Sequence, residues 1–127
     1  MRSSSIMSEG SLPALDLYST ETKGGNTLYV SGMVALNNKG KIVGKNDATA
    51  QTRQILESMK SVIEAAGGTM ADIIFNMIFL KDLADYPKMN AVYCEYFPKN
   101  PPARYCARAD LVKPEFLVEI TAIAHIS

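Results

Sequence analysis

The pattern of hydrophobic positions divides the chain into strand-like and helix-like segments after a polar beginning. Residues 28–34 have the β-branched and aromatic content that is typical of a strand. The run Asn-Asn-Lys-Gly at 37–40 follows as a turn signal, so we expect a hairpin here. Residues 73–80 form a short continuous apolar run, which predicts a strand that is covered on both faces.

A first helix is predicted between these strands. Asn46 or Asp47 can cap its start, and Gly67-Gly68 supplies a residue able to turn left-handed at its end. Its apolar residues recur at helical spacing and are Ile55, Leu56, Met59, Val62, Ile63 and Ala66.

A second helix is predicted after residue 80. Asp85 is its expected cap, Pro87 lies in its first turn, and it ends before Pro98. Its apolar stripe consists of Tyr86, Met89, Tyr93, Tyr96 and Phe97.

Two further strands, around 104–111 and 117–126, close the chain. The order of strands, helix, strand, helix and two strands predicts an α+β sandwich, a mixed sheet with two helices on one face. The other face is left uncovered. Because residues 118–124 are apolar on both sides of their strand, we expect that face to pack against another subunit in a homo-oligomer.

Length and composition fit one globular domain. The chain has 127 residues, of which 47% are hydrophobic and 20% charged. We expect residues 1–14 to be a flexible N-terminal extension and residues 15–127 to be a single domain. Thirteen basic residues balance thirteen acidic ones, so neither nucleic acid nor an anionic membrane is the favoured partner.

Cysteine usage and the chain start bear on location and cofactors. Cys94 and Cys106 have neither zinc-site spacing nor the density of a disulfide scaffold, which favours a reducing compartment and no metal. The first residues lack the apolar stretch of a signal peptide, so we expect a cytoplasmic protein. Neither pair of adjacent glycines fits a phosphate loop or a dinucleotide fingerprint, and we expect no cofactor.

The candidate chemistry lies in the last two strands, where Arg104 and Glu119 stand in otherwise apolar runs. A buried charge costs several kcal/mol unless it meets a partner. Arg104 either anchors a small carboxylate through two hydrogen bonds or forms a structural salt bridge with Glu119 or Asp110. Glu119 either pairs or handles protons, because burial among aliphatic residues raises a carboxyl pKa.

Other residues are weaker candidates. Cys106 shares the strand face of Arg104 and is either a nucleophile or, as we favour, a buried inert thiol. Asn90 falls near the apolar stripe of the second helix and either holds a loop or lines a pocket. Ser31-Gly32 suits either close approach to a ligand or a bulge, and Tyr18 either closes over a pocket or packs on the sheet.

Several separated motifs resemble the Rid family of reactive-intermediate deaminases, and the resemblance covers the chain from about Tyr18 to the end. These motifs are Tyr29-Val30-Ser31-Gly32, Glu64-Ala65-Ala66-Gly67-Gly68, Pro102-Ala103-Arg104-Tyr105-Cys106 and Val118-Glu119-Ile120. Within the family, 68–72, 75–79 and 111–114 look most like the RutC branch, which deaminates 3-aminoacrylate in pyrimidine degradation.

The resemblance implies a chorismate-mutase-like homotrimer with pockets in the clefts between subunits. It implies that Arg104 binds the substrate carboxylate and that Glu119 positions water and handles protons. The residues that it places around the substrate are Tyr18, Ser31, Gly32, Asn90 and Cys106.

Three functions follow as hypotheses. The first is a cofactor-independent deaminase of small enamine or imine acids, such as 3-aminoacrylate or 2-aminoacrylate. The second is a module that binds small carboxylates or 2-oxo acids without turnover. The third is a ribonuclease or translation inhibitor, against which the zero net charge argues.

Overall fold

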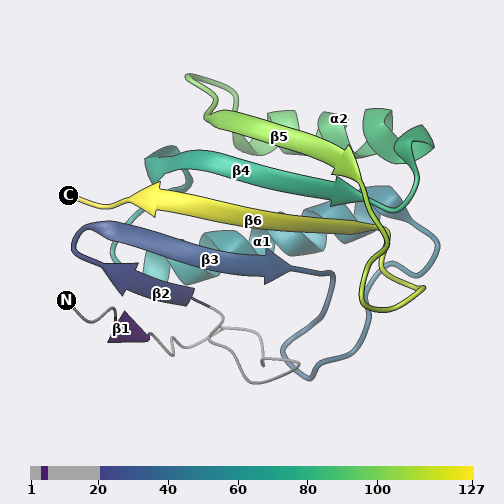
Figure 1. The fold of residues 1–127 in the computed structure, drawn as a ribbon, viewed down its shortest axis with the longest axis horizontal. Helices are drawn as coiled ribbons and strands as arrows, with labels where there is room; N and C mark the ends of the chain where they lie inside the picture. Colours follow the sequence, from purple (N-terminus) through teal and green to yellow (C-terminus); the bar gives the residue numbers. More distant parts are fainter. Residues whose placement is uncertain (1–3, 6–20) are drawn as a thin grey trace.

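A computed structural model describes residues 4–5 and 21–127, which form a sheet of six strands with two α-helices (Figure 1). The strands are β1 (Ser4–Ser5), β2 (Glu21–Gly24), β3 (Thr27–Met33), β4 (Ile73–Leu80), β5 (Ala103–Arg108) and β6 (Val118–His125). The helices are α1 (Ala48–Ala65) and α2 (Tyr86–Tyr96), and short 3-10 turns, η1 (Met70–Asp72) and η2 (Leu83–Asp85), precede β4 and α2.

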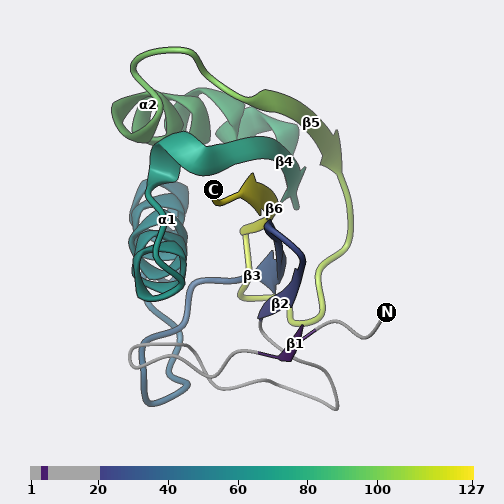
Figure 2. The same cartoon turned by 90° about the vertical axis from the view of Figure 1, so that its left-hand side faces the viewer.

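The sheet is mixed, in the order β1-β2-β3-β6-β4-β5. All neighbouring strands are antiparallel except β4 and β5, which run parallel. Parallel neighbours require a crossover connection, and α2 provides it. Both helices lie on the same side of the sheet, which Figure 2 shows edge-on. The predicted α+β sandwich is therefore confirmed.

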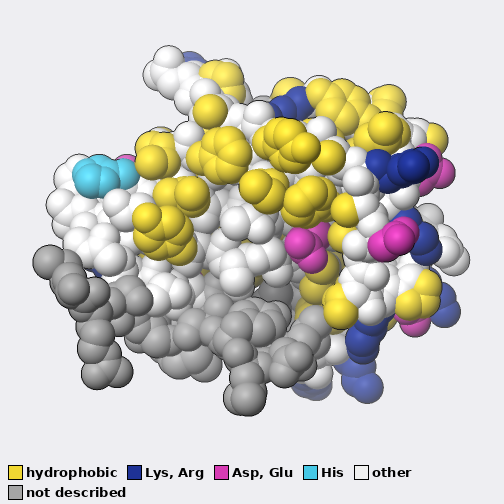
Figure 3. Space-filling model, viewed as in Figure 1, with side chains coloured by type: hydrophobic (Ala, Val, Ile, Leu, Met, Phe, Trp, Pro, Cys, Tyr) yellow, Lys and Arg dark blue, Asp and Glu magenta, His cyan; other side chains and the backbone are white. Residues whose placement is uncertain are grey.

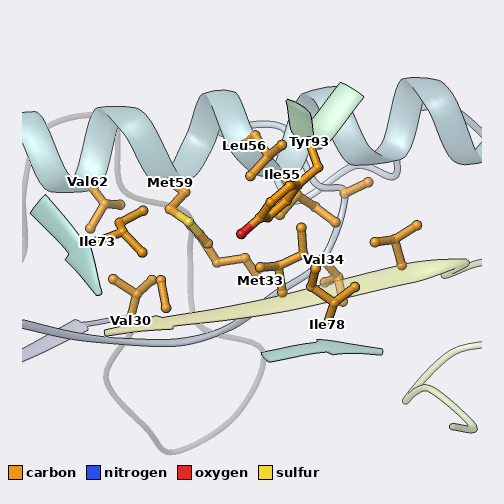
Figure 4. Packing of buried hydrophobic residues seen from close by; sticks show 14 of the residues in the cluster. Val30, Met33, Val34, Ile55, Leu56, Met59, Val62, Ile73, Ile78 and Tyr93 are labelled. Atoms are coloured by element: carbon orange, nitrogen blue, oxygen red, sulfur yellow. The ribbon is translucent and has the colours of Figure 1, made fainter. Parts of the chain in front are cut away.

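Helix α1 begins and ends as the sequence predicts. The Asp47 side chain accepts a hydrogen bond from the Ala50 N–H at 3.1 Å, which satisfies a donor of the first turn. Past the end, Gly67 has a φ of 92°, a left-handed conformation that favours glycine. The apolar side of α1 packs against the sheet together with residues of α2, as Figure 4 shows for Leu56, Met59 and Tyr93.

Helix α2 has the predicted bounds but a different start. Asp85 occupies the cap position, yet its side chain makes no capping hydrogen bond. Its backbone explains this, because Asp85 has the helical φ and ψ of −84° and −2° and not the extended conformation from which a cap side chain accepts a hydrogen bond. The Asp85 N–H donates to the Asp82 carbonyl at 3.0 Å within the preceding turn η2. The chain therefore enters α2 from a 3-10 turn, with Pro87 in the first helical turn.

The hairpin is not where the turn signal places it. Residues 37–40 do turn the chain, but only a single bridge, Leu36–Ile42, flanks them. The hairpin of this region joins β2 to β3 through Gly25, whose φ is 59°. Strand β2 escapes detection because Glu-Thr-Lys-Gly has no apolar alternation, and pairing with β3 decides its conformation.

The two faces of the sheet differ in cover. On the helix side, the alternating residues Val118, Ile120, Ala122 and Ala124 of β6 are buried. On the other side, no helix of the described residues lies over the sheet (Figure 2). The intervening residues of β6, Glu119, Thr121 and Ile123, remain partly exposed there. The described residues thus cover β4 on one face, and cover of its other face by a second subunit stays a prediction. Among the described residues, no helix combines the length and apolarity needed to cross a bilayer.

Candidate functional site

The strand pairing places Arg104 and Glu119 on opposite faces of the sheet. Arg104 pairs with Asn76 of β4, and Glu119 pairs with Phe79 of the same strand. Residues three positions apart on a strand point to opposite faces. Arg104 consequently faces the helices and Glu119 faces the open side. A salt bridge between them within one chain is excluded, and Arg104 makes none with Asp110 or any other acid of the described residues.

Arg104 lines a cavity of about 350 Å³ between the start of β5 and the end of α2. The lining residues are Asn90, Tyr93, Cys94, Phe97, Pro101, Pro102 and Arg104. The structure therefore brings together two of the predicted site residues, Arg104 and Asn90, which come from different elements. This volume lies at the lower end of the range for small-molecule sites.

Aromatic side chains of α2 hold the Arg104 guanidinium. Its central carbon lies 4.7 Å from the ring centroid of Tyr93 and 5.6 Å from that of Tyr86. Its Nη2 also donates a hydrogen bond to the Tyr86 hydroxyl. Cation–π contacts of this kind stabilise a partly buried charge without a carboxylate. Arg104 thus keeps its charge available for an anion.

The sequence alone does not assign Tyr86 or Tyr93 to the site. Tyr86 and Tyr93 are expected from the sequence only as part of the apolar stripe of the second helix. The usable signal is their spacing with Asn90, because steps of four and three residues put all three on one helix face. The position of β5 beside β4 places Arg104 across this face, and no pattern in the sequence predicts that placement.

Cys106 lies two positions beyond Arg104 on β5 and is half-buried. Burial raises the pKa of its thiol, although the charge of Arg104 acts in the opposite direction. The raised pKa favours the thiol form over the thiolate at neutral pH, which disfavours a nucleophilic role. Cys106 is not among the residues that line the cavity.

Glu119, on the open face, lies directly over Gly32. A Cβ built on Gly32 would fall 2.7 Å from the Glu119 Oε2. The pairing of β3 with β6 shifts register between Val30 and Met33, so Ser31-Gly32 forms an irregular step in β3. The bulge interpretation of this dipeptide is therefore confirmed, and the missing side chain of Gly32 leaves room for the Glu119 carboxylate. Close approach to a ligand stays a prediction.

The Glu119 carboxylate is half-buried, and among the described residues it has no hydrogen bond or ion pair. Burial raises its pKa above the ordinary value of 4.5. A carboxyl group with a raised pKa exchanges protons more readily near neutral pH than an exposed one. The raised pKa agrees with the expectation from the sequence, and a role of Glu119 in proton transfer stays a prediction.

Two remaining residues of interest are placed as follows. Tyr18 lies outside the described residues. His125 is exposed at the end of β6 and pairs with Thr27. In the described part of the chain, no group of three His, Cys, Asp or Glu side chains could hold a metal ion.

An apolar surface surrounds Glu119 on the open face and occupies much of the view in Figure 3. Cross-strand pairs build it, with Tyr105 beside Met77 and Phe79 beside Glu119. We call it the open-face patch; its residues are Tyr29, Phe75, Met77, Phe79, Tyr105, Ala107 and Ile123. Tyr29 and Tyr105 are 51% and 54% exposed, and a contiguous exposed apolar patch is typical of an interaction surface.

Comparison with known proteins gives consistent matches over nearly the whole chain. The family model described as Endoribonuclease L-PSP matches residues 9–126. A curated relative, 3-aminoacrylate deaminase RutC of Acinetobacter baylyi, is 49% identical over 121 residues, which are 95% of this chain and 96% of that protein.

Solved structures agree with this match. YyfA of Yersinia pestis, named as a member of the conserved Rid protein family, has a TM-score of 0.90 and 31% identity, and covers 98% of this chain and 100% of its own. The crystal structure of E. coli TdcF with bound serine has a TM-score of 0.88 and 29% identity, with 97% and 98% coverage.

Proposed function

This chain belongs to the Endoribonuclease L-PSP family, which is the Rid family, and from that premise we propose that it is a deaminase of small enamine or imine acids. The proposed substrate is 3-aminoacrylate, which would give malonic semialdehyde and ammonia. The name of the 49% identical RutC of Acinetobacter baylyi supports this choice. 2-Aminoacrylate is the second substrate to test.

One observation carries the proposal. Arg104 lines a cavity of about 350 Å³ and has no carboxylate partner among the described residues. A guanidinium in this state is suited to bind the carboxylate of a small acid through two parallel hydrogen bonds. Asn90 lies in the same lining and can supply a further polar contact.

The chemistry requires proton transfer and water but no electron transfer. The enamine tautomerises to an imine while Arg104 holds its carboxylate. Glu119 takes a proton from a bound water as hydroxide adds to the imine carbon, and it gives this proton to the nitrogen, which forms a carbinolamine. Glu119 then takes the hydroxyl proton of the carbinolamine and passes it to the same nitrogen, so that the C–N bond breaks as the C=O bond forms. Ammonia leaves and the carbonyl acid remains. The raised pKa of Glu119 supports this dual role.

A second copy of the chain would complete the site. Arg104 and Asn90 lie on the helix side, whereas Ser31, Gly32 and Glu119 lie on the open side. One substrate can reach both groups only if the helix-side cavity of one subunit meets the open face of a neighbour. We propose a homotrimer with three such clefts, in which the open-face patch is buried between subunits.

The test is steady-state release of ammonia from enzymatically generated 3-aminoacrylate by the full chain. We expect acceleration over the uncatalysed reaction, with a loss of at least about a hundredfold in kcat/KM for Arg104→Ala and for Glu119→Gln. Lys60→Glu, an exposed change on α1, is the matched control and should leave the rate unchanged. Wild-type protein that does not accelerate hydrolysis of 3-aminoacrylate or 2-aminoacrylate would refute the enzyme proposal.

Carboxylate binding without turnover is the second candidate, because the Arg104 cavity supports binding whether or not Glu119 acts. It predicts that pyruvate binds with a dependence on Arg104 while neither enamine is turned over. Glu119→Gln would then leave the affinity for pyruvate unchanged.

A further inference from the structure

Arg104 lies on a surface made by two tyrosines of one helix. Tyr86 and Tyr93 are seven residues apart on α2, so two helical turns bring them to the same face. Tyr93 is buried, with 3% of its surface exposed, whereas Tyr86 is 37% exposed. The buried ring lies nearer to the guanidinium carbon, at 4.7 Å against 5.6 Å. Tyr93 therefore provides the fixed part of this surface.

Asn76 fixes Tyr93 in turn. Its Nδ2 donates a hydrogen bond to the Tyr93 hydroxyl at 2.9 Å, and Asn76 is fully buried. Asn76 is also the strand partner of Arg104 in the β4–β5 pairing. Asn76 thus contacts both the strand that carries Arg104 and the ring that lies under the Arg104 side chain. Phe97 also packs against this ring, with the two ring centroids 4.5 Å apart.

This arrangement leaves the binding edge of the guanidinium accessible. A guanidinium presents its N–H donors in its own plane, so contact with an aromatic face does not occupy them. The hydrogen bond to Tyr86 uses one donor of Nη2. The remaining donors can point into the cavity, where a carboxylate requires two of them.

We propose that Tyr93, held by Asn76, is a positioning residue that sets the orientation in which Arg104 grips the carboxylate of its ligand. The inference rests on the proposed function only in that Arg104 binds a carboxylate, and it holds for an enzyme and for a binding module alike. Burial raises the pKa of Tyr93, so the residue remains a neutral phenol and adds no competing negative charge beside Arg104.

The experiment measures the affinity of the full chain for pyruvate, a stable small carboxylate, by NMR titration. Tyr93→Leu is compared in the wild-type and Arg104→Lys backgrounds, since lysine keeps the charge but loses the planar fork. We expect Tyr93→Leu to weaken pyruvate binding about tenfold in the wild-type background, but less than about twofold in the Arg104→Lys background. Tyr93→Phe, which keeps the ring, should restore the affinity to within about threefold of the wild type.

A purely structural role for Tyr93 predicts a different result. Loss of packing would weaken binding by the same factor in both backgrounds, and this outcome would overturn the proposal. Met89→Ala is the matched control, because Met89 is a buried α2 residue that does not line the cavity. It should lower the melting temperature and leave pyruvate affinity unchanged.

The enzyme assay separates the two proposals. A wild type that binds pyruvate but releases no ammonia from either enamine refutes the deaminase proposal and leaves the Tyr93 test intact. A wild type that turns over 3-aminoacrylate, with equal losses from Tyr93→Leu in both backgrounds, refutes only the role of Tyr93. A wild type that binds no carboxylate refutes both.

Discussion

On the helix-covered face of the sheet, Arg104 lies 4.7 Å from the ring centroid of Tyr93 and donates a hydrogen bond to Tyr86. On the open face, Glu119 has no such support among the described residues and lies over the bare backbone of Gly32. Both residues are charged groups in otherwise apolar strands. Within one chain, aromatic rings stabilise the Arg104 cation. The Glu119 anion is partly desolvated and has no compensating contact among the described residues.

This difference indicates which half of the proposed site is incomplete within one chain. The cation half is organised within one chain, by α2 and β5 together with Asn76 of β4. The anion half borders the open-face patch, which the described residues do not cover (Figure 3). We propose that a neighbouring subunit completes the anion half.

The largest effect is expected from a charge in the open-face patch. Met77→Glu introduces a carboxylate beside Tyr105 and Thr121, and burying it in a subunit interface would cost several kcal/mol. We expect a folded monomer whose kcat/KM is lower by at least about a hundredfold, because the two half-sites no longer meet. Light scattering after size-exclusion chromatography and circular dichroism check the state of the protein.

The same measurements on Lys60→Glu, which lies on the exposed side of α1, provide the control. This variant should keep the mass and the activity of the wild type. If Met77→Glu retains the wild-type mass, or if the wild type is itself a fully active monomer, the open-face patch is not the subunit interface.

An intermediate effect is expected from Gly32→Ala. The added methyl carbon would fall 2.7 Å from the Glu119 Oε2, so the carboxylate must move, while the flexible side chain keeps the cost in stability small. We expect about a tenfold loss in kcat/KM with little change in melting temperature. Gly24→Ala is the matched control, since a Cβ added there would have no neighbouring atom within 4 Å. Equal activity of the two variants would show that the position of Glu119 over Gly32 is unimportant.

The smallest effect concerns stability and pH. Because the pKa of Glu119 is raised in the folded state, the folded protein binds this proton more tightly than the unfolded chain. Its contribution to stability is therefore lost as pH rises from about the ordinary value of 4.5 through the folded pKa. Glu119→Gln should be more stable than the wild type at pH 7, by a few tenths of a kcal/mol for a half-exposed group, and no more stable at pH 4.

Thermal unfolding of both proteins at pH 4 and pH 7 measures this difference. Glu64→Gln, at an exposed acid of α1, provides a comparison for the removal of a charge. The measured quantity is the stability of Glu119→Gln minus that of the wild type. If this difference is lower at pH 7 than at pH 4, Glu119 has a favourable partner in the assembled protein.

Several parts of the fold could be predicted because they depend on local chemistry. Asp47 marks the start of α1 through its capping hydrogen bond, and Gly67 marks its end through a left-handed φ. Neighbouring residues determine both features. The continuous run 73–80 gives β4 its bounds. Strand β2 could not be predicted, because its four residues carry no apolar alternation and owe their conformation to pairing with β3.

The candidate site divides in the same way. Arg104, Glu119 and Asn90 stand out in the sequence because a charge or an amide among apolar residues needs a partner. Tyr86 and Tyr93 do not stand out, since tyrosines in a helical stripe are ordinary core residues. Asn76 carries the same signal as Asn90, an amide within an apolar run, but the sequence does not indicate its partner. Their roles depend on which residue lies opposite them across α2, β4 and β5.

Local patterns in the sequence specify both helices, most of the strands and the residues whose chemistry needs a partner. Those features follow from spacing and from the cost of burying charge, which are properties of neighbouring residues. The tertiary structure adds that Arg104 and Glu119 face opposite sides of the sheet, and that aromatic rings rather than a carboxylate hold Arg104. Strand order and register are set by contacts between segments far apart in the chain, so no local pattern specifies them.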